Sequence, residues 1–198
     1  MRLDAAPGRD AWLTPWLPLV LNRAAVAPVL ELGCGSGKDT AILVGAGLRV
    51  VAIDISSAWL AKARSVAPEA EFVCQDVRAP FPASVAGYGA VVASLSLHYF
   101  NWPDTVALVQ RIHASLGQGG LLLCRLNSTR DHNFGASGYP AISEGYFLVG
   151  GEPKRFFNRE DVASLFAEGW CTLSCRERTI NRYVLPKAVW ELVVEKDA

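Results

Sequence analysis

The sequence predicts an α/β fold, in which helices connect the strands of an open sheet. An apolar run at residues 29–32 is followed by a glycine-rich turn and then by a helix-forming segment at residues 38–44. Second and third apolar runs, at residues 48–55 and 71–74, continue the alternation of strand and helix. The chain has 198 residues, 51% of them hydrophobic, so we expect a single domain over residues 1–198 with a sizeable core.

Further elements follow in order along the chain. Prolines within the apolar segment 10–22 predict short helical turns before the first strand. Ser56 is a candidate cap for a helix at residues 58–65, and Asn158 is a candidate cap for a helix that ends at Gly169. The remaining expected elements are strands at residues 88–97 and 121–126, a helix at 104–116, and closing strands at 170–180 and 188–195.

Composition and charge disfavour several classes of partner. The formal net charge is +0 and no long run of Lys or Arg occurs, which disfavours DNA and RNA. No apolar run approaches the ~20 residues of a membrane span, and the N-terminus lacks a signal-peptide core. Five scattered cysteines suit a reducing cytoplasm, and Cys171 and Cys175 lack the second pair of ligands that a zinc site needs. We therefore expect a cytoplasmic protein without a metal, a nucleic-acid partner or a membrane partner.

The glycine-rich turn is the most informative stretch of the chain. Gly33, Gly35 and Gly37 alternate with other residues directly after the first strand, and Glu31 lies two residues before them. Such glycines let the backbone turn sharply and approach a ligand without an intervening Cβ. Strand, glycine turn and helix in this order place helix N–H groups against a bound cofactor, although a tight turn without any ligand uses the same residues.

Two familiar glycine motifs do not fit this turn. The phosphate-binding P-loop needs a glycine where Leu32 stands and a Ser or Thr where Asp39 stands. The dinucleotide fingerprint needs its third glycine where Lys38 stands, which makes an NAD-dependent oxidoreductase a less favoured alternative.

Two acidic residues follow at the ends of the next two strands. Asp54 ends the run at 48–55 and lies 17 residues after Gly37, where a carboxylate is placed to accept hydrogen bonds from ribose hydroxyls. Asp76 follows the run at 71–74, where a carboxylate can meet an adenine amino group. Each taken alone is better explained as a helix cap or turn residue, but the glycine turn and both carboxylates occur in the order of an adenosyl site.

The sequence Val-Leu-Glu-Leu-Gly-Cys-Gly-Ser-Gly at residues 29–37 resembles the first motif of class I S-adenosylmethionine-dependent methyltransferases. The resemblance covers residues 27 to about 100. It implies a Rossmann-like, seven-stranded, mostly parallel sheet with a C-terminal antiparallel hairpin and helices on both faces, and S-adenosyl-L-methionine as the cofactor. The cofactor-binding residues that it implies are Glu31, Gly33, Cys34, Gly35, Gly37, Asp54, Ile55, Asp76, Val77 and Ser94.

Candidate catalytic residues follow the strand at 88–97, because ligands of open α/β sheets bind beyond the carboxyl ends of the strands. His98 and Tyr99 are the nearest side chains that can accept a proton from a substrate there. The alternative is that His98 packs against or caps the following helix.

Two other segments supply candidate substrate residues. Trp12 and Trp16 belong to residues 1–25, which in methyltransferases of this size often lie over the cofactor, with residues 26–198 as the Rossmann-like core. Packing in the core explains both tryptophans equally well. Arg130 and His132 belong to the polar insertion 127–140, which is equally well explained as a surface loop.

The methyl acceptor is less clear than the cofactor. A fainter resemblance, over residues 127–196, is to small bacterial methyltransferases of the tellurite-resistance type, through Lys154-Arg155-Phe156-Phe157 and the later run around Val189-Trp190-Glu191. We expect a small-molecule substrate, with a metalloid or a thiol as the alternative acceptor, and a monomer or homodimer. A protein that binds the cofactor without catalysis is a further alternative.

Overall fold

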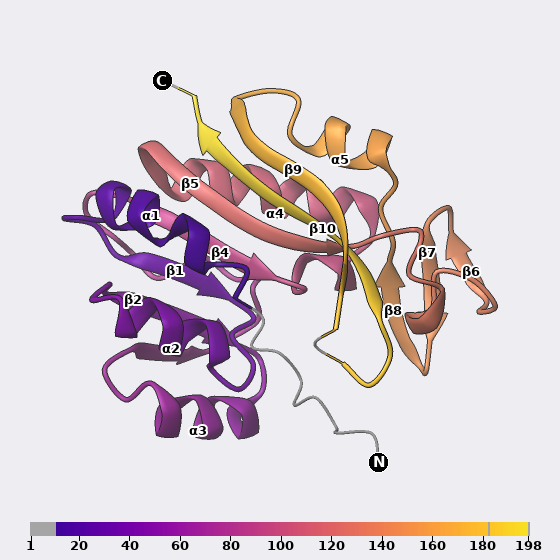
Figure 1. The fold of residues 1–198 in the computed structure, drawn as a ribbon, viewed down its shortest axis with the longest axis horizontal. Helices are drawn as coiled ribbons and strands as arrows, with labels where there is room; N and C mark the ends of the chain where they lie inside the picture. The colour runs from indigo at the N-terminus through magenta and orange to yellow at the C-terminus, as the bar shows by residue number, and fades with distance from the viewer. Residues whose placement is uncertain (1–10, 182, 198) are drawn as a thin grey trace, which may run out of the picture.

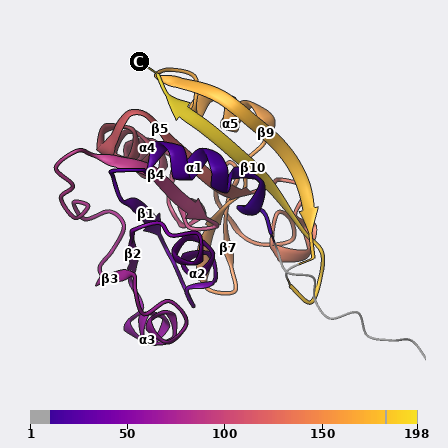
Figure 2. The ribbon, with the colours of Figure 1, turned by 60° about the vertical axis from the view of Figure 1, so that its left-hand side comes forward.

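The computed structural model describes residues 11–181 and 183–197 and contains a seven-stranded sheet in the order β3-β2-β1-β4-β5-β10-β9 (Figure 1). Its strands are β1 (Val29–Leu32), β2 (Val50–Asp54), β3 (Glu71–Cys74), β4 (Tyr88–Ser94), β5 (Leu116–Asn127), β9 (Trp170–Ile180) and β10 (Lys187–Lys196). The first five strands pair in parallel, and β10 runs antiparallel to both β5 and β9. The long hairpin of β9 and β10 curves along one side of the sheet (Figure 2). The predicted sheet with its C-terminal antiparallel hairpin is confirmed.

Helices cover both faces of this sheet, because alternate side chains of each strand point to opposite faces. Val29 of β1 packs with Leu43 on one face, whereas Leu30 packs with Leu108 on the other. The first face is covered by α1 (Leu17–Arg23), α2 (Lys38–Gly45) and α3 (Ser57–Val66), and the second by α4 (Trp102–Ser115) and α5 (Arg159–Leu165).

Local capping residues explain where several helices begin. Ser56 accepts a hydrogen bond from the backbone N–H of Trp59 at 3.3 Å, and α3 begins there. Asn158 opens α5 in a reciprocal capping box with Asp161, as the sequence predicted. In contrast, α2 has no side-chain cap, and its first residue follows Gly37 in a left-handed conformation.

A second sheet was not expected from the sequence. Three short antiparallel strands follow the predicted insertion: β6 (Ala141–Ser143), β7 (Tyr146–Val149) and β8 (Glu152–Arg155). Within the insertion itself the chain forms a short 3-10 turn, η3 (His132–Phe134). The boundary between the fourth helix and fifth strand also differs from the prediction, because the glycines at 117–120 lie within β5 rather than before it.

Candidate functional site

A cleft of about 760 Å³ lies at the carboxyl ends of β1, β2 and β4. Its lining includes two of the three turn glycines, both predicted adenosyl carboxylates and several aromatic rings. The residues that line it are Gly33, Gly35, Asp54, Ile55, Ser56, Trp59, Asp76, Val77, Arg78, Leu95, Ser96, Tyr99, Phe100, Asn101, Asp104, Tyr146, Glu152 and Pro153. This is the edge of the sheet at which open α/β folds bind ligands.

The three turn glycines all have positive φ but serve different purposes. A Cβ on Gly33 would lie 2.6 Å from Cβ of Ser96, so Gly33 allows the segment after β4 to pack closely. A Cβ on Gly37 would lie 2.9 Å from Cα of Ala63, so Gly37 allows α2 to approach α3. A Cβ on Gly35 would meet no atom within 4 Å, because Gly35 faces the open cleft. Gly35 is therefore the glycine whose missing side chain leaves room for a ligand.

Asp54 points toward the glycine turn and holds it in place. Its Oδ2 accepts a hydrogen bond from the backbone N–H of Gly35 at 2.8 Å. Its Oδ1 accepts one from the N–H of Ser56 at 2.9 Å. A carboxylate has about four acceptor sites, so these two bonds leave capacity for hydroxyl groups of a ligand.

Glu31 and Cys34 support the turn from behind the cleft. Glu31 is 3% exposed and accepts a hydrogen bond from Oγ1 of Thr40 on α2 at 2.6 Å. Burial, with the nearby charges of Glu31 and Asp54, raises the pKa of the Cys34 thiol above its ordinary value. Neither side chain lines the cleft, so both are placed to fix the turn rather than to touch a ligand through their side chains.

Asp76 lies at the carboxyl end of β3 and is paired with Arg78. The two side chains approach to 2.6 Å, and the backbone N–H of Arg78 also donates to Asp76. Hydrogen bonds from Arg78 lower the pKa of the Asp76 carboxyl, which keeps it ionised. Ile55 and Val77 line the same end of the cleft, and Ile55 is 70% exposed there despite its large apolar side chain. These apolar side chains suit the flat face of a heterocyclic ring.

The segment after β4 carries buried polar groups without partners. Among the described residues, the hydroxyls of Ser94 and Ser96 are buried and make no hydrogen bond. Leu95 between them is the one described non-glycine residue with positive φ, at 58°. Strain and unpaired polar groups together are typical of a ligand-binding segment.

His98 lies in η2 (Leu97–Tyr99) and is 5% exposed. Burial, with the positive charges of Lys187 and Lys154, lowers the pKa of His98 to about 3. Its Nδ1 has no hydrogen-bond partner among the described residues, and its ring lies 4.2 Å from that of Tyr99 between centroids. His98 is therefore neutral near pH 7 and lies behind the cleft wall rather than on it.

Tyr99 lines the cleft directly and belongs to what we call the outer wall, formed by Tyr99, Phe100, Tyr146, Glu152 and Pro153. Burial and the carboxylate of Glu152 raise the pKa of the Tyr99 hydroxyl above its ordinary value. This hydroxyl therefore stays protonated at neutral pH and is available as a hydrogen-bond donor.

Arg155 and Tyr146 attach the second sheet to the cleft, which sequence analysis missed. The Tyr146 hydroxyl donates to the backbone oxygen of Tyr99 at 3.0 Å. The Arg155 side chain donates from Nε to the backbone oxygen of Phe100 at 3.2 Å, and its guanidinium lies 5.0 Å from the Tyr146 ring centre. The short apolar run Tyr-Phe-Leu-Val at 146–149, followed by two glycines, was the available signal for this hairpin.

The four predicted substrate residues lie outside this cleft. Trp12 is buried, donates from Nε1 to Asp39 at 3.2 Å and lies beneath the guanidinium of Arg125 at 4.5 Å. Trp16 packs against the same face of the sheet. Residues 1–10 of the segment proposed to cover the cofactor lie outside the described residues.

Arg130 and His132 lie outside the cleft, in the segment that follows β5, where His132 belongs to η3 and η3 contacts β10. Arg130 forms a 3.2 Å ion pair with Glu177, and its side chain is 77% exposed. A nitrogen of His132 lies 3.3 Å from the hydroxyl of Ser137.

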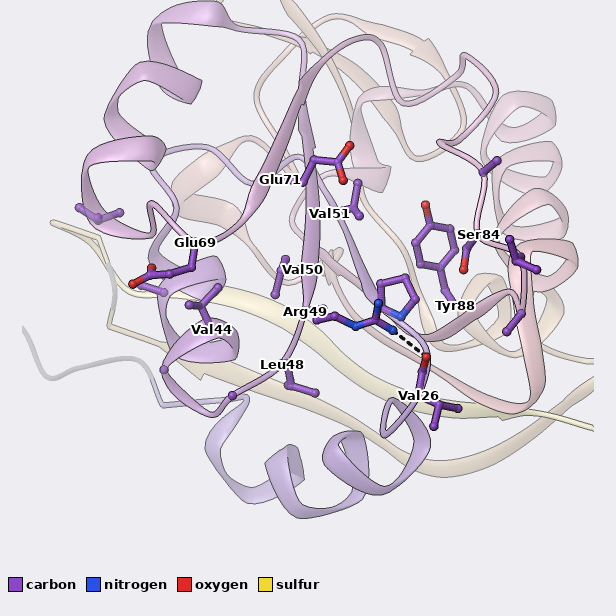
Figure 3. Close-up of a pocket in the computed structure, with 18 residues that line it drawn as sticks. Val26, Val44, Leu48, Arg49, Val50, Val51, Glu69, Glu71, Ser84 and Tyr88 are labelled. Atoms are coloured by element: carbon purple, nitrogen blue, oxygen red, sulfur yellow. Dashed lines mark hydrogen bonds between the residues drawn. The ribbon is translucent and has the colours of Figure 1, made fainter.

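A second cavity, of about 960 Å³, lies at the amino ends of β1, β2 and β3 (Figure 3). Glu69, Glu71 and Tyr88 are among its lining residues, and Arg49 donates to the backbone oxygen of Val26 at 2.6 Å. It is larger than the carboxyl-end cleft but contains neither the glycine turn nor Asp54. Size therefore does not identify the candidate site, whereas position at the carboxyl edge does.

Comparison with known proteins relates this chain to methyltransferases. Residues 29–120 match the model of a family described as a methyltransferase domain. The chain is 17% identical to an S-adenosylmethionine-dependent methyltransferase of Methanosarcina mazei, with a TM-score of 0.73 over 91% of this chain and 97% of that one. It is 20% identical to 1,6-didemethyltoxoflavin-N1-methyltransferase of Burkholderia thailandensis, with a TM-score of 0.69 over 96% and 80% of the two chains. That structure contains S-adenosylhomocysteine.

The chain has a methyltransferase fold. Curated relatives include the trans-aconitate 2-methyltransferase of Paracidovorax citrulli, 35% identical over 109 residues, and that of Escherichia coli, 34% identical over 100 residues. An uncharacterized methyltransferase of Synechocystis is 30% identical over 106 residues. The matched part of this chain spans 41%, 38% and 50% of these three relatives, respectively.

The matched methyltransferase domain and the outer wall overlap only in part. The domain match ends at residue 120, so it includes the glycine turn, both carboxylates and η2. The second sheet, at residues 141–155, lies beyond it. The likeness to tellurite-resistance-type methyltransferases, which depended on residues 127–196, stays a prediction.

Two kinds of feature are absent from the described residues. Within residues 11–181 and 183–197, no three His, Cys, Asp or Glu side chains are grouped to hold a metal ion. No helix in the described part of the chain is long and apolar enough to cross a membrane.

Proposed function

We propose that this chain binds S-adenosylmethionine in the carboxyl-end cleft and transfers its methyl group to a small-molecule acceptor. The observation that carries the proposal is the double hydrogen bond from Gly35 and Ser56 to Asp54. It places a buried carboxylate beside an open glycine position, where an adenosyl group needs a hydroxyl acceptor and close approach to the backbone.

The lining residues fit the parts of this cofactor. Asp54 would accept hydrogen bonds from the ribose, and Asp76 would accept one from the adenine amino group. Ile55 and Val77 would flank the adenine, and the space over Gly35 would take the methionine portion. When bound, the cofactor supplies a sulfonium methyl that is already electrophilic, so the chain's part is alignment and exclusion of water.

The residues after β4 would act on the acceptor side. Ser96 carries an unpaired hydroxyl at the cleft, and Tyr99 presents a protonated hydroxyl, so both are placed to orient an acceptor. We propose that His98 contributes by packing behind Tyr99 and by accepting a hydrogen bond at neutral pH. Its low pKa makes it a weak proton acceptor.

Calorimetry with S-adenosylmethionine, S-adenosylhomocysteine and NADH tests the cofactor. Binding of S-adenosylmethionine and S-adenosylhomocysteine, but not of NADH, supports the proposal. Binding of NADH but of neither of the other two compounds contradicts it. An acceptor screen that measures S-adenosylhomocysteine release then separates an enzyme from a binding protein. Cofactor binding without transfer to any acceptor would favour the non-catalytic alternative.

A second candidate acceptor is trans-aconitate, which the names of the curated relatives favour. The screen therefore includes trans-aconitate, together with tellurite, selenite and a simple thiol for the resemblance drawn from the sequence. Release of S-adenosylhomocysteine with one of these compounds would assign the acceptor class. Size-exclusion chromatography of the same sample would test the expected monomer or homodimer, and cell fractionation would test the expected cytoplasmic location.

A further inference from the structure

The outer wall of the cleft is the surface that an acceptor would meet, if the proposed function is correct. It comes from Tyr99 of η2, from Phe100 directly after η2, and from the second sheet. It borders the Asp76 end of the cleft, because the guanidinium of Arg78 lies 5.4 Å from the Phe100 ring centre. Three of its five residues are aromatic, namely Tyr99, Phe100 and Tyr146. Aromatic faces attract flat ligands and also cationic groups, because each ring has a negative face.

The charged side chains of the cleft are mostly acidic. Its lining contains four carboxylates and one guanidinium. Asp54 and Asp76 lie at the adenosyl end, and the one guanidinium, that of Arg78, is bound to Asp76 at 2.6 Å. Asp104 and Glu152 remain at the acceptor end. Clefts lined by one sign of charge concentrate ligands of the opposite sign.

The cations nearest the outer wall are already engaged. Arg78 lies 5.4 Å from the Phe100 ring centre and is paired with Asp76. Lys187 is buried in a 2.6 Å pair with Asp131, and Arg155 is held by backbone oxygens of Phe100 and Glu144. Lys154 lies 3.7 Å from Glu152 itself, so it offsets part of that carboxylate. Even with this offset, carboxylates outnumber cations among the described residues of the wall and lining.

We propose that the acceptor is an aromatic molecule that carries a positive charge, bound between Tyr99 and Tyr146 with its cation toward Glu152 and Asp104. A polycarboxylate such as trans-aconitate would face like charges there, and the one guanidinium of the lining, that of Arg78, is already paired with Asp76. The proposal depends on the proposed function, because it concerns the second ligand of the same cleft.

Two matched ligand pairs test the proposal on the full chain saturated with S-adenosylhomocysteine. The pairs are tyramine with 4-hydroxyphenylacetate, and tryptamine with indole-3-acetate, which share a ring and differ in the sign of their charge. We expect the amines to bind at least ten-fold more tightly by calorimetry at low salt. The preference should shrink in 0.5 M sodium chloride, where the Debye length is only about 4 Å.

Charge variants then connect the preference to the outer wall. Glu152→Gln with Asp104→Asn should reduce the preference to three-fold or less. Glu69→Gln, in the amino-end cavity, is the matched control and should leave it unchanged. Equal or tighter binding of the carboxylates or of trans-aconitate overturns the proposal, as does absence of binding by both amines. Because S-adenosylhomocysteine binding is measured first, failure of the proposed function is recognised separately.

Discussion

The adenosyl end and the outer wall of the cleft are built in opposite ways. At the adenosyl end, Asp54 bonds to Gly35 and Ser56, all within two consecutive strand–turn units. At the outer wall, Tyr146 and Arg155 bond to backbone oxygens of Tyr99 and Phe100, 47 and 55 residues away in sequence. The first end depends on short motifs and backbone geometry, whereas the second depends on long-range packing.

The matched methyltransferase domain covers the two ends of the cleft unequally. The domain match contains the whole adenosyl end and stops before the second sheet. Cofactor binding is thus the property that relatives can be expected to share. Under the proposed function, acceptor choice would depend on side chains of β7 and β8.

Removing the Asp54 carboxylate should have the largest effect on cofactor affinity, because this carboxylate holds the glycine turn at the adenosyl end of the cleft. Asp54→Ala removes two hydrogen bonds from the turn and the proposed ribose contact, and charged hydrogen bonds contribute about 1.5–3 kcal/mol each. We expect the affinity for S-adenosylhomocysteine to fall by about 100-fold or more, measured by calorimetry. Glu69→Ala serves as the control and should bind normally, and an unchanged affinity for the Asp54 variant would contradict the assignment.

Two glycine substitutions at the same end of the cleft separate effects on ligand affinity from effects on the free energy of unfolding. Gly37→Ala puts a Cβ against Cα of Ala63 at 2.9 Å, and Gly35→Ala puts one into open space. Both carry the left-handed penalty of about 1–2 kcal/mol, and Gly37→Ala adds overpacking of about 1–3 kcal/mol. Urea unfolding should therefore show the larger loss for Gly37→Ala, and calorimetry the larger loss of affinity for Gly35→Ala. The reverse order would mean that Gly37 is the residue that contacts the ligand.

The low pKa of His98 predicts a pH-dependent stability for the outer wall. Below about pH 6.5 the unfolded chain binds a proton on this histidine, whereas the folded chain keeps it neutral until about pH 3. The free energy of unfolding should therefore fall by about 2 kcal/mol from this group between pH 7 and pH 5. Urea unfolding of the wild type and of His98→Gln at both pH values measures the contribution. Equal pH dependence in the two proteins would show that His98 is not buried as described.

Arg130→Ala should have the smallest effect. In its ion pair with Glu177 the Arg130 side chain is 77% exposed and that of Glu177 is 16% exposed, and solvent-exposed pairs contribute about 0.2–1 kcal/mol. We expect a change within about 0.5 kcal/mol in the free energy of unfolding and no change in S-adenosylhomocysteine affinity. Once an acceptor is known, a ten-fold fall in kcat/KM for that acceptor would instead place Arg130 in the reaction.

Sequence analysis predicted the features that depend on neighbouring residues. The strand at 71–74, the cap at Asn158 and the position of Asp54 at the turn all follow from local patterns. Gly37 was predicted to bind the cofactor, but a Cβ at this position would point toward Ala63 of α3. No local sequence pattern distinguishes a glycine that allows two helices to pack closely from a glycine that leaves room for a ligand. The strands of the second sheet had a local signal at 146–149 that was overlooked, whereas the attachment of that sheet through Arg155 depends on residues far away in sequence.

Titration of ¹⁵N-labelled protein with S-adenosylhomocysteine tests the central claim most directly, because amide shifts report which of the two cavities is occupied. The account predicts the largest changes at Gly35, Ile55 and Val77, in the carboxyl-end cleft. Changes concentrated instead at Arg49, Glu69 and Glu71, in the amino-end cavity, would contradict it.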